Sequence, residues 1–157
     1  MNRTTFTLDE TDKKILSELQ ADSRMSVRQL AARVHRSSTP VFERLNRLEE
    51  NGVIKSYTIE IDREKAGCGF TVFCNVKLKH ITTETHKAFA TEMKDMREVS
   101  ECHNISGDYD YMLKIEVPDM KSYHTFITDK LGRLPMLSSV HSIFVMNTIK
   151  QIPPQIS

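Results

Sequence analysis

The stretch RVHRSSTPVFER, residues 33–44, places two serines, a threonine and a proline inside a segment that otherwise reads as helix. Proline has no backbone N–H and is tolerated only in the first turn of a helix, so Pro40 marks the start of one. Ser37, Ser38 and Thr39 are all suitable N-cap residues. The restriction on the residue before proline favours Thr39 as the cap, but an earlier start also fits.

Three apolar series with helical spacing surround this break. They are Ile15, Leu16 and Leu19; Val27, Leu30, Ala31 and Val34; and Val41, Leu45 and Leu48. The first predicts a helix that ends near Gln20, and the second predicts a short helix after Ser26, where Gln29 completes a capping box. The third predicts a helix that stops at Asn51 and Gly52. The second and third helices with the turn between them form a helix-turn-helix pattern.

Positive charge is concentrated around this turn. The whole chain has a net charge of +1, yet residues 24–47 hold six arginines and a single acidic residue, Glu43. Arginine pairs with guanine edges and with phosphates, so the segment predicts a double-stranded DNA partner. The alternative is the solvated surface of an ordinary three-helix bundle. The residues predicted to contact DNA are Arg28, Arg36, Ser37, Ser38, Thr39, Glu43, Arg44 and Arg47.

The composition is that of a globular protein. The 157 residues are 39% hydrophobic and 27% charged, which excludes an intrinsically disordered chain. Three cysteines without a C-x-x-C pair argue against a secreted disulfide framework. The sequence has no signal-like start and no apolar run long enough to span a bilayer. We therefore expect a cytoplasmic, nucleoid-associated protein with no membrane partner.

The apolar spacing changes from helical to alternating after a first domain of residues 1–53. Residues 54–68 read as an extended connector or strand, residues 69–151 as a second domain, and residues 152–157 as a tail. Within the second domain, strands are expected at 70–78, 99–105, 111–117 and 139–149, with helices after Thr83 and Pro118. This βαββαβ order is ferredoxin-like: an antiparallel sheet with both helices on one face. The whole chain is therefore of the α+β class, and a second copy is the obvious cover for the other face of the sheet.

An enzyme is the rival reading of a different class, with Cys102 as a thiol and His103 as its base. Neighbouring residues on a strand point to opposite faces, so these two side chains cannot readily share one site. The histidines are scattered and no glycine-rich phosphate loop is present, so we expect no metal and no cofactor. The chain is therefore predicted not to be an enzyme.

Three segments together resemble the Lrp/AsnC (leucine-responsive regulatory protein) family of transcription regulators. They are LDETDKKIL at 8–16, SVRQLAARVHRSSTPVFERLNRLEENGVI at 26–54 and ECHNISGDYDYMLKIEVPDM at 101–120. The resemblance extends over nearly the whole chain, to about Gln151. It implies an N-terminal helix-turn-helix domain, a C-terminal ligand-sensing domain, homodimers formed through the sheets, and higher assemblies, often octamers.

The resemblance also implies a small effector, usually an amino acid such as leucine, bound near the segments that match Ser106–Asp110 and Leu134–Ser142. Asp108 or Asp110 can accept from its ammonium group, and the backbone of Gly107 or serine hydroxyls can donate to its carboxylate. By local sequence alone, SGDYD at 106–110 is a hairpin turn. The predicted effector residues are Ser106, Gly107, Asp108, Tyr109, Asp110, Met136, Ser138 and Ser142.

One position departs from the family pattern. Where the family commonly has Leu-Pro-Gly, this chain has Met136 after Leu134 and Pro135, so a bulky thioether lies near the expected pocket. The identity of the effector is left open by this change. A third reading, besides the regulator and the enzyme, is an architectural DNA-binding protein without an effector response.

Overall fold

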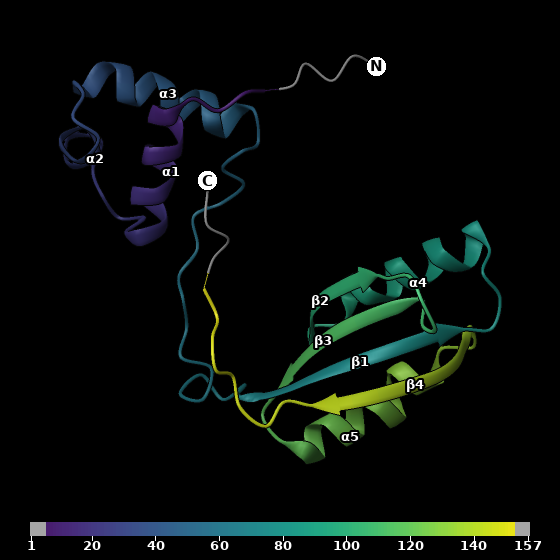
Figure 1. Ribbon diagram of the computed structural model, residues 1–157. Coiled ribbons are helices and arrows are strands. Elements are labelled where there is room, and N and C mark those ends of the chain that lie inside the picture. The colour runs from purple at the N-terminus through teal and green to yellow at the C-terminus, as the bar shows by residue number, and fades with distance from the viewer. Residues whose placement is uncertain (1–5, 153–157) are drawn as a thin grey trace. The chain divides into compact units, whose positions relative to one another are not determined.

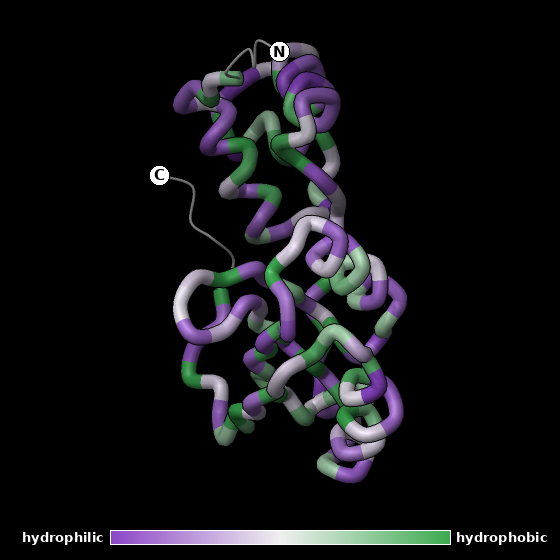
Figure 2. Tube along the Cα trace, turned by 90° about the vertical axis from the view of Figure 1, so that its right-hand side faces the viewer, coloured by the Kyte–Doolittle hydropathy of each residue, from purple (hydrophilic) through white to green (hydrophobic). Residues whose placement is uncertain are grey.

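The computed structural model describes residues 6–152, which divide into two compact units (Figure 1). One unit ends at Glu60 and includes the short C-terminal segment from Lys150, and the other spans Ile61–Ile149. Residues 1–5 of the expected first domain and residues 153–157 of the expected tail lie outside the described part. Hydrophobic and hydrophilic residues interleave along both units, as Figure 2 shows, and each unit builds its own core.

Three helices make up the first unit: α1 (Glu10–Ala21), α2 (Val27–Arg33) and α3 (Ser38–Glu50). Their shared core consists of the apolar residues that the helical spacing singled out, including Ile15, Leu30, Val41 and Leu48 at 0–1% exposure. The predicted helix-turn-helix is therefore confirmed, with α2 and α3 as its two helices.

The helix ends follow from local side-chain chemistry. Ser26 caps α2, and the predicted capping box is confirmed, because the Gln29 N–H donates to the Ser26 hydroxyl and the Ser26 N–H donates to the Gln29 side chain. Helix α3 ends as predicted, with Asn51 as its C-cap and Gly52 at a φ of 68°, a left-handed conformation that glycine adopts without strain.

The start of α3 decides an alternative that the sequence left open. Ser37, not Thr39, is the N-cap, and its backbone is extended although its side chain makes no capping hydrogen bond. Pro40 is then the third residue of the helix, where its missing N–H still has no intrahelical partner to lose. The steric restriction that proline places on Thr39 is a preference, and the helical turn overrides it.

The second unit contains the predicted βαββαβ order. Its elements are β1 (Phe70–Leu78), α4 (Thr83–Asp95), β2 (Val99–Asn104), β3 (Tyr111–Val117), α5 (Met120–Asp129), a short 3₁₀ helix η1 (Leu131–Arg133) and β4 (Leu137–Phe144). The strands pair antiparallel in the order β2-β3-β1-β4, and α4 and α5 cover one face of the sheet (Figure 1).

The core of the second unit lies between this sheet and its two helices. Val72, Cys74 and Val76 alternate inward along β1, and Phe89 of α4 and Phe126 of α5 meet them. All five side chains are 0–1% exposed. The predicted alternation of β1 is therefore confirmed, and it directs the residues between them to the opposite face.

The structure decides between connector and strand for the segment before β1, and it differs from the sequence expectation at the end of β4. Residues 54–68, expected as an extended connector or strand, include no strand, and the chain turns at 63–67. Strand β4 ends at Phe144 instead of residue 149, because Phe144 pairs with Val72 and the Val145 N–H donates to the Thr71 carbonyl. Strand β1 begins at Phe70, so it offers almost no further backbone for pairing.

Candidate DNA-binding and effector sites

Helix α3 presents one face away from the core of its unit. Val41 and Leu48 are fully buried on the inner side, and by 3.6-residue spacing Thr39, Glu43 and Asn46 lie on the opposite side. Among the described residues, none of these three side chains forms a hydrogen bond with another side chain or with the backbone. This outer face is therefore available to a partner.

Arg44 and Arg47, two of the predicted DNA contacts, have partners within the chain. Arg44 Nη1 donates to Asp9 Oδ2 at 2.6 Å and to Asp12 Oδ1 at 2.8 Å. Arg47 Nη2 donates to Asp12 Oδ2 at 2.7 Å. The Asp12 side chain is fully buried, and its oxygens are satisfied by these two guanidinium groups and by the Asp9 N–H, which donates to Oδ2 at 3.1 Å. The arginines thus hold α3 against the first turn of α1.

Two charged groups of this cluster, Asp9 and Arg44, have shifted pKa values. The pKa of Asp9 lies below its ordinary value, first because the Asp12 N–H donates to its carboxylate and then because Arg44 does. The pKa of Arg44 is raised by its hydrogen bonds to Asp9 and Asp12. Nothing in the local sequence indicates these ion pairs, because the partners lie more than thirty positions apart.

Arg47 nonetheless remains partly exposed to solvent. Its side chain remains 46% exposed, and its guanidinium lies 5.2 Å from the centroid of the Phe6 ring. A guanidinium has five N–H donors, so the one bond to Asp12 leaves others for a phosphate. Arg47 can therefore both stabilise the unit and contact a nucleic acid backbone.

The remaining predicted DNA contacts gather at the turn before α3. Arg36, Ser37 and Ser38 are exposed, and His35 before them has a φ of 54°, which turns the chain sharply between the two helices. The Arg36 guanidinium donates to the neighbouring His35 carbonyl. Arg28 is exposed on α2. The turn thus combines cations, hydroxyl groups and the start of a helix, all of which suit phosphate contacts.

The predicted effector loop, residues 106–110, connects β2 and β3, and its two aspartates have different roles. The Asp110 carboxylate accepts a hydrogen bond of 2.7 Å from the Leu78 N–H, and its backbone bonds to Val76, Ile105 and Asn104. Asp110 therefore fixes the loop to β1. Asp108 is exposed, so it is the carboxylate of this loop that remains accessible.

Other members of the predicted effector set also differ in accessibility. The Ser142 hydroxyl shares a hydrogen bond with the Tyr123 hydroxyl, and the side chain of Met136 packs against the core of the unit. Tyr109 stacks on His141 with ring centroids 6.1 Å apart. Ser106 and Ser138 are exposed, and Gly107 has a φ of 120°. The loop and β4 thus leave Ser106, Asp108 and Ser138 open.

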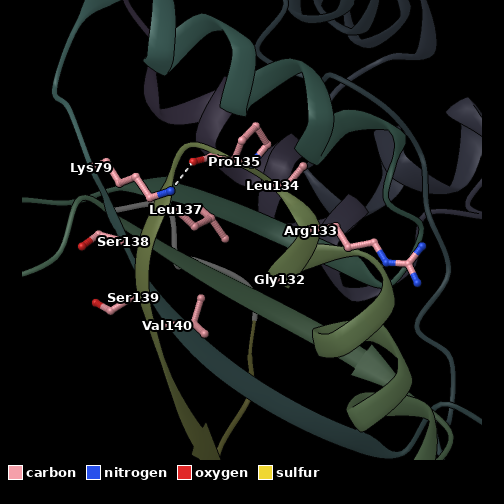
Figure 3. Close-up of a pocket in the computed structure, with 9 residues that line it drawn as sticks. All are labelled: Lys79, Gly132, Arg133, Leu134, Pro135, Leu137, Ser138, Ser139 and Val140. Carbon is pink, nitrogen blue, oxygen red and sulfur yellow. Dashed lines mark hydrogen bonds between the residues drawn. The ribbon is translucent and has the colours of Figure 1, made fainter.

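A cavity of about 290 Å³ lies beside the start of β4 (Figure 3). It is lined by Lys79, Gly132, Arg133, Leu134, Pro135, Leu137, Ser138, Ser139 and Val140. The Lys79 ammonium donates to the Pro135 carbonyl at 2.8 Å, and the Arg133 guanidinium pairs with Asp129 at 3.2 Å. Ser138 was among the predicted effector residues, whereas Lys79 and Arg133 were not, because both lie outside the two segments that the resemblance indicated.

The rival catalytic pair is not assembled. Cys102 lies opposite Leu113 in the sheet and His103 opposite Met112, so the two side chains point to different faces. Cys102 is exposed, although partial burial of its thiol raises the pKa, and His103 bonds to Glu101 instead. Among residues 6–152 there is no group of three or more histidines, cysteines or acidic residues that could hold a metal ion, and no helix long and apolar enough to cross a membrane.

Comparison with known families agrees with this arrangement. Residues 8–55 match the model of a winged helix-turn-helix DNA-binding domain, and residues 71–155 match that of the Lrp/AsnC ligand binding domain. The leucine-responsive regulatory protein of Escherichia coli strain K12 is 38% identical over 144 residues, which cover 92% of this chain and 88% of that protein.

Solved structures give the same result over the full length. A transcriptional regulator of Neisseria meningitidis in complex with L-Met has a TM-score of 0.89 at 30% identity, covering 96% of this chain and 97% of its own. An AsnC family regulator of Agrobacterium tumefaciens has a TM-score of 0.88 at 34% identity, covering 94% and 95%. The chain therefore belongs to the Lrp/AsnC family of DNA-binding transcriptional regulators, and it is not an enzyme.

Proposed function

We propose that the chain is a sequence-specific transcription regulator whose DNA binding and assembly respond to an amino acid. The observation that carries the proposal is the pairing of an outward-facing α3 and a cationic turn in one unit with a ligand-binding-type second unit in the same chain. The E. coli relative is named leucine-responsive, and the Neisseria regulator was solved with L-Met. Such a regulator acts at the cytoplasmic nucleoid.

A symmetric dimer formed through the sheets is part of this proposal. The face of the sheet away from α4 and α5 carries Phe73, Met112 and Ile143, and Ile143 is 44% exposed within one chain. A second copy would remove this apolar surface from water. Dimers would then assemble further, up to an octamer. Two copies of α3 would enter successive major grooves roughly 34 Å apart, on inverted half-sites.

The effector would bind through the open groups near the 106–110 loop and the start of β4. Asp108 is the accessible acceptor for an ammonium group, and Ser138 is an accessible donor to a carboxylate beside Lys79. The thioether of Met136 packs against the core and does not line the cavity, so it would leave room for an amino acid there. Binding would shift the assembly and hence the number of linked helix-turn-helix units on one DNA.

Footprinting of genomic fragments, thermal melting and sedimentation, each with and without L-leucine, L-methionine and their D-enantiomers, test the proposal together. We expect salt-sensitive protection of inverted half-sites, a rise in melting temperature with one L-amino acid, and a changed assembly size with the same ligand. Protection without any ligand response would support the architectural alternative. Absence of salt-sensitive binding to any duplex would overturn the proposal.

A further inference from the structure

Phe42 is the large apolar side chain on the outer part of α3. It is the fifth residue of the helix and is 52% exposed, whereas Val41 beside it is fully buried. By helical spacing it neighbours Thr39 and Asn46 along the outer face. In a helix-turn-helix the N-terminal part of the second helix approaches the base edges, so the position of Phe42 is one that contacts bases.

The arginines of α3 do not occupy this position. Arg44 and Arg47 turn toward α1, where Asp9 and Asp12 hold them through three hydrogen bonds of 2.6–2.8 Å. Arginine is the side chain that reads guanine through two parallel bonds, and a guanidinium held by a buried carboxylate is poorly placed to do so. The groups left at the outer face are hydroxyl, amide, carboxylate and the Phe42 ring.

A single exposed aromatic residue elsewhere on a protein would need no explanation. In the major groove, however, a phenylalanine ring has one good partner, the 5-methyl group of thymine, because the other base-edge groups are hydrogen-bond donors and acceptors. A charged phosphate offers the ring no comparable contact. The apolar surface of Phe42 and the methyl group would be removed from water together.

We infer that Phe42 contacts a thymine methyl group in each half-site and so determines sequence preference at that base pair. The inference rests on the proposed DNA-binding function and names one side chain and one chemical group within it. It separates Phe42 from the arginines, which position the helix and contact the backbone. The contact is made by the ring surface, so a smaller apolar side chain keeps part of it and a polar one keeps none.

The test uses one operator in two chemical forms. The full-length wild-type chain first selects a duplex from a random pool. This duplex is then synthesised once with thymine and once with uracil, which lacks only the 5-methyl group. Burial of one methyl group corresponds to about a fourfold change in affinity, and two half-sites to about fifteenfold. Fluorescence anisotropy should therefore show wild-type binding weakened by about that factor on the uracil duplex. Single replacements should locate the effect at the same position of each half-site.

Replacing Phe42 should remove the difference between the two duplexes. We expect Phe42→Ala to bind the thymine duplex as weakly as wild type binds the uracil duplex, with no further loss on uracil, and Phe42→Leu to fall between. Phe42→Gln, which suits a helix, replaces Phe42→Ala if thermal melting shows that the alanine variant is unfolded. Ile81→Ala, which removes a 70% exposed apolar side chain from the second unit, is the matched control and should keep the full methyl effect.

The possible results distinguish a failure of the Phe42 contact from a failure of the proposed DNA-binding function. Equal wild-type affinity for both duplexes, or a Phe42→Ala variant that keeps the wild-type preference for thymine, would overturn the role of Phe42 while leaving DNA binding established. A wild-type chain that selects no duplex would overturn both.

Discussion

Arg47 of α3 donates a 2.7 Å hydrogen bond to Asp12 of α1, although 35 positions separate them in the chain. Arg44 donates to the other oxygen of the same carboxylate at 2.8 Å. A fully buried carboxylate therefore connects the helix that faces outward to the helix that starts the chain. The placement of α3 depends on this ionic contact as well as on apolar packing.

Asp12→Ala should lower the free energy of unfolding of the helical unit by about 2–4 kcal/mol, because it leaves two cations without their buried partner. The arginines reach solvent, which keeps the loss below that of a wholly buried pair. Urea unfolding followed by circular dichroism measures it. Glu10→Ala is the control on the same helix turn: Glu10 is 84% exposed, and its loss should change stability by no more than about 0.5 kcal/mol. Equal effects of the two substitutions would contradict the assigned role.

Arg47→Ala should weaken binding to specific and random duplexes alike and reduce the salt dependence of the affinity by about one phosphate contact. The reason is that Asp12 holds one side of the guanidinium, which leaves it suited to a phosphate and not to a guanine edge. Titrations at several salt concentrations distinguish the two. Arg97→Ala, on the surface of the second unit, is the matched control. A loss of about 1–3 kcal/mol confined to one base position would instead assign Arg47 to a guanine.

Acid should weaken the contact made by Asp9. The pKa of Asp9 is lower in the folded chain than its ordinary value of 3.8, so its stabilisation is complete above that value and is lost as the pH falls through the lower folded pKa. The stability difference between wild type and Asp9→Asn should therefore narrow as the pH is lowered from about 6 toward 2. Asparagine keeps a capping oxygen, so the helix start is preserved. A difference that stays constant with pH would exclude an ionic contribution.

Substitutions of the two aspartates of the 106–110 loop should have different effects: one should lower stability and the other should reduce the response to ligand. Asp110→Ala removes the acceptor of the Leu78 N–H and should cost about 1–3 kcal/mol of unfolding free energy. Asp108→Asn should leave stability within about 0.5 kcal/mol and reduce the thermal shift produced by the amino acid effector. Thermal melts with and without ligand measure both. A loss of stability at position 108 and a loss of ligand response at position 110 would contradict the roles assigned to the two aspartates.

Cys74 should resist alkylation until the second unit opens. It is fully buried on β1, and burial raises the pKa of its thiol to about 11. Iodoacetamide followed by mass spectrometry should modify the exposed Cys102 first, and Cys74 at a rate that rises with added urea. Modification of Cys74 as fast as Cys102 in buffer alone would show that this core opens readily.

Local signals in the sequence were sufficient for most of the fold. The capping box at Ser26, the stop at Asn51 and Gly52, and the alternation over 70–78 depend on neighbouring residues, and each is found where expected. The predicted end of β4 was five residues too late. The strand ends where its antiparallel partner β1 begins, and the sequence of β4 itself does not indicate that point. The N-cap of α3 could not be chosen among Ser37, Ser38 and Thr39 from the sequence, because each of these adjacent residues could serve.

The candidate sites were less accessible to sequence reasoning. The arginine cluster was located correctly on the helix-turn-helix, but the contacts of Arg44 and Arg47 with Asp12 are tertiary and have no local signature. The inward direction of Met136 and the hydrogen bond of Ser142 to Tyr123 likewise depend on how β4 packs. Residue type indicates what a side chain can do, whereas its surroundings decide whether it is free to do it.

Each of the two units closes its own hydrophobic core, and the two sets of core residues have no member in common. Mutations on α3 that alter operator preference therefore need no compensating change in the core of the second unit. Mutations in the second unit that alter ligand choice need none in the core of the three-helix unit. A lineage can diverge in one trait while conserving the other. Exchange of whole modules between relatives within the 54–68 connector should accordingly yield hybrids that bind the operators of one parent and respond to the effector of the other.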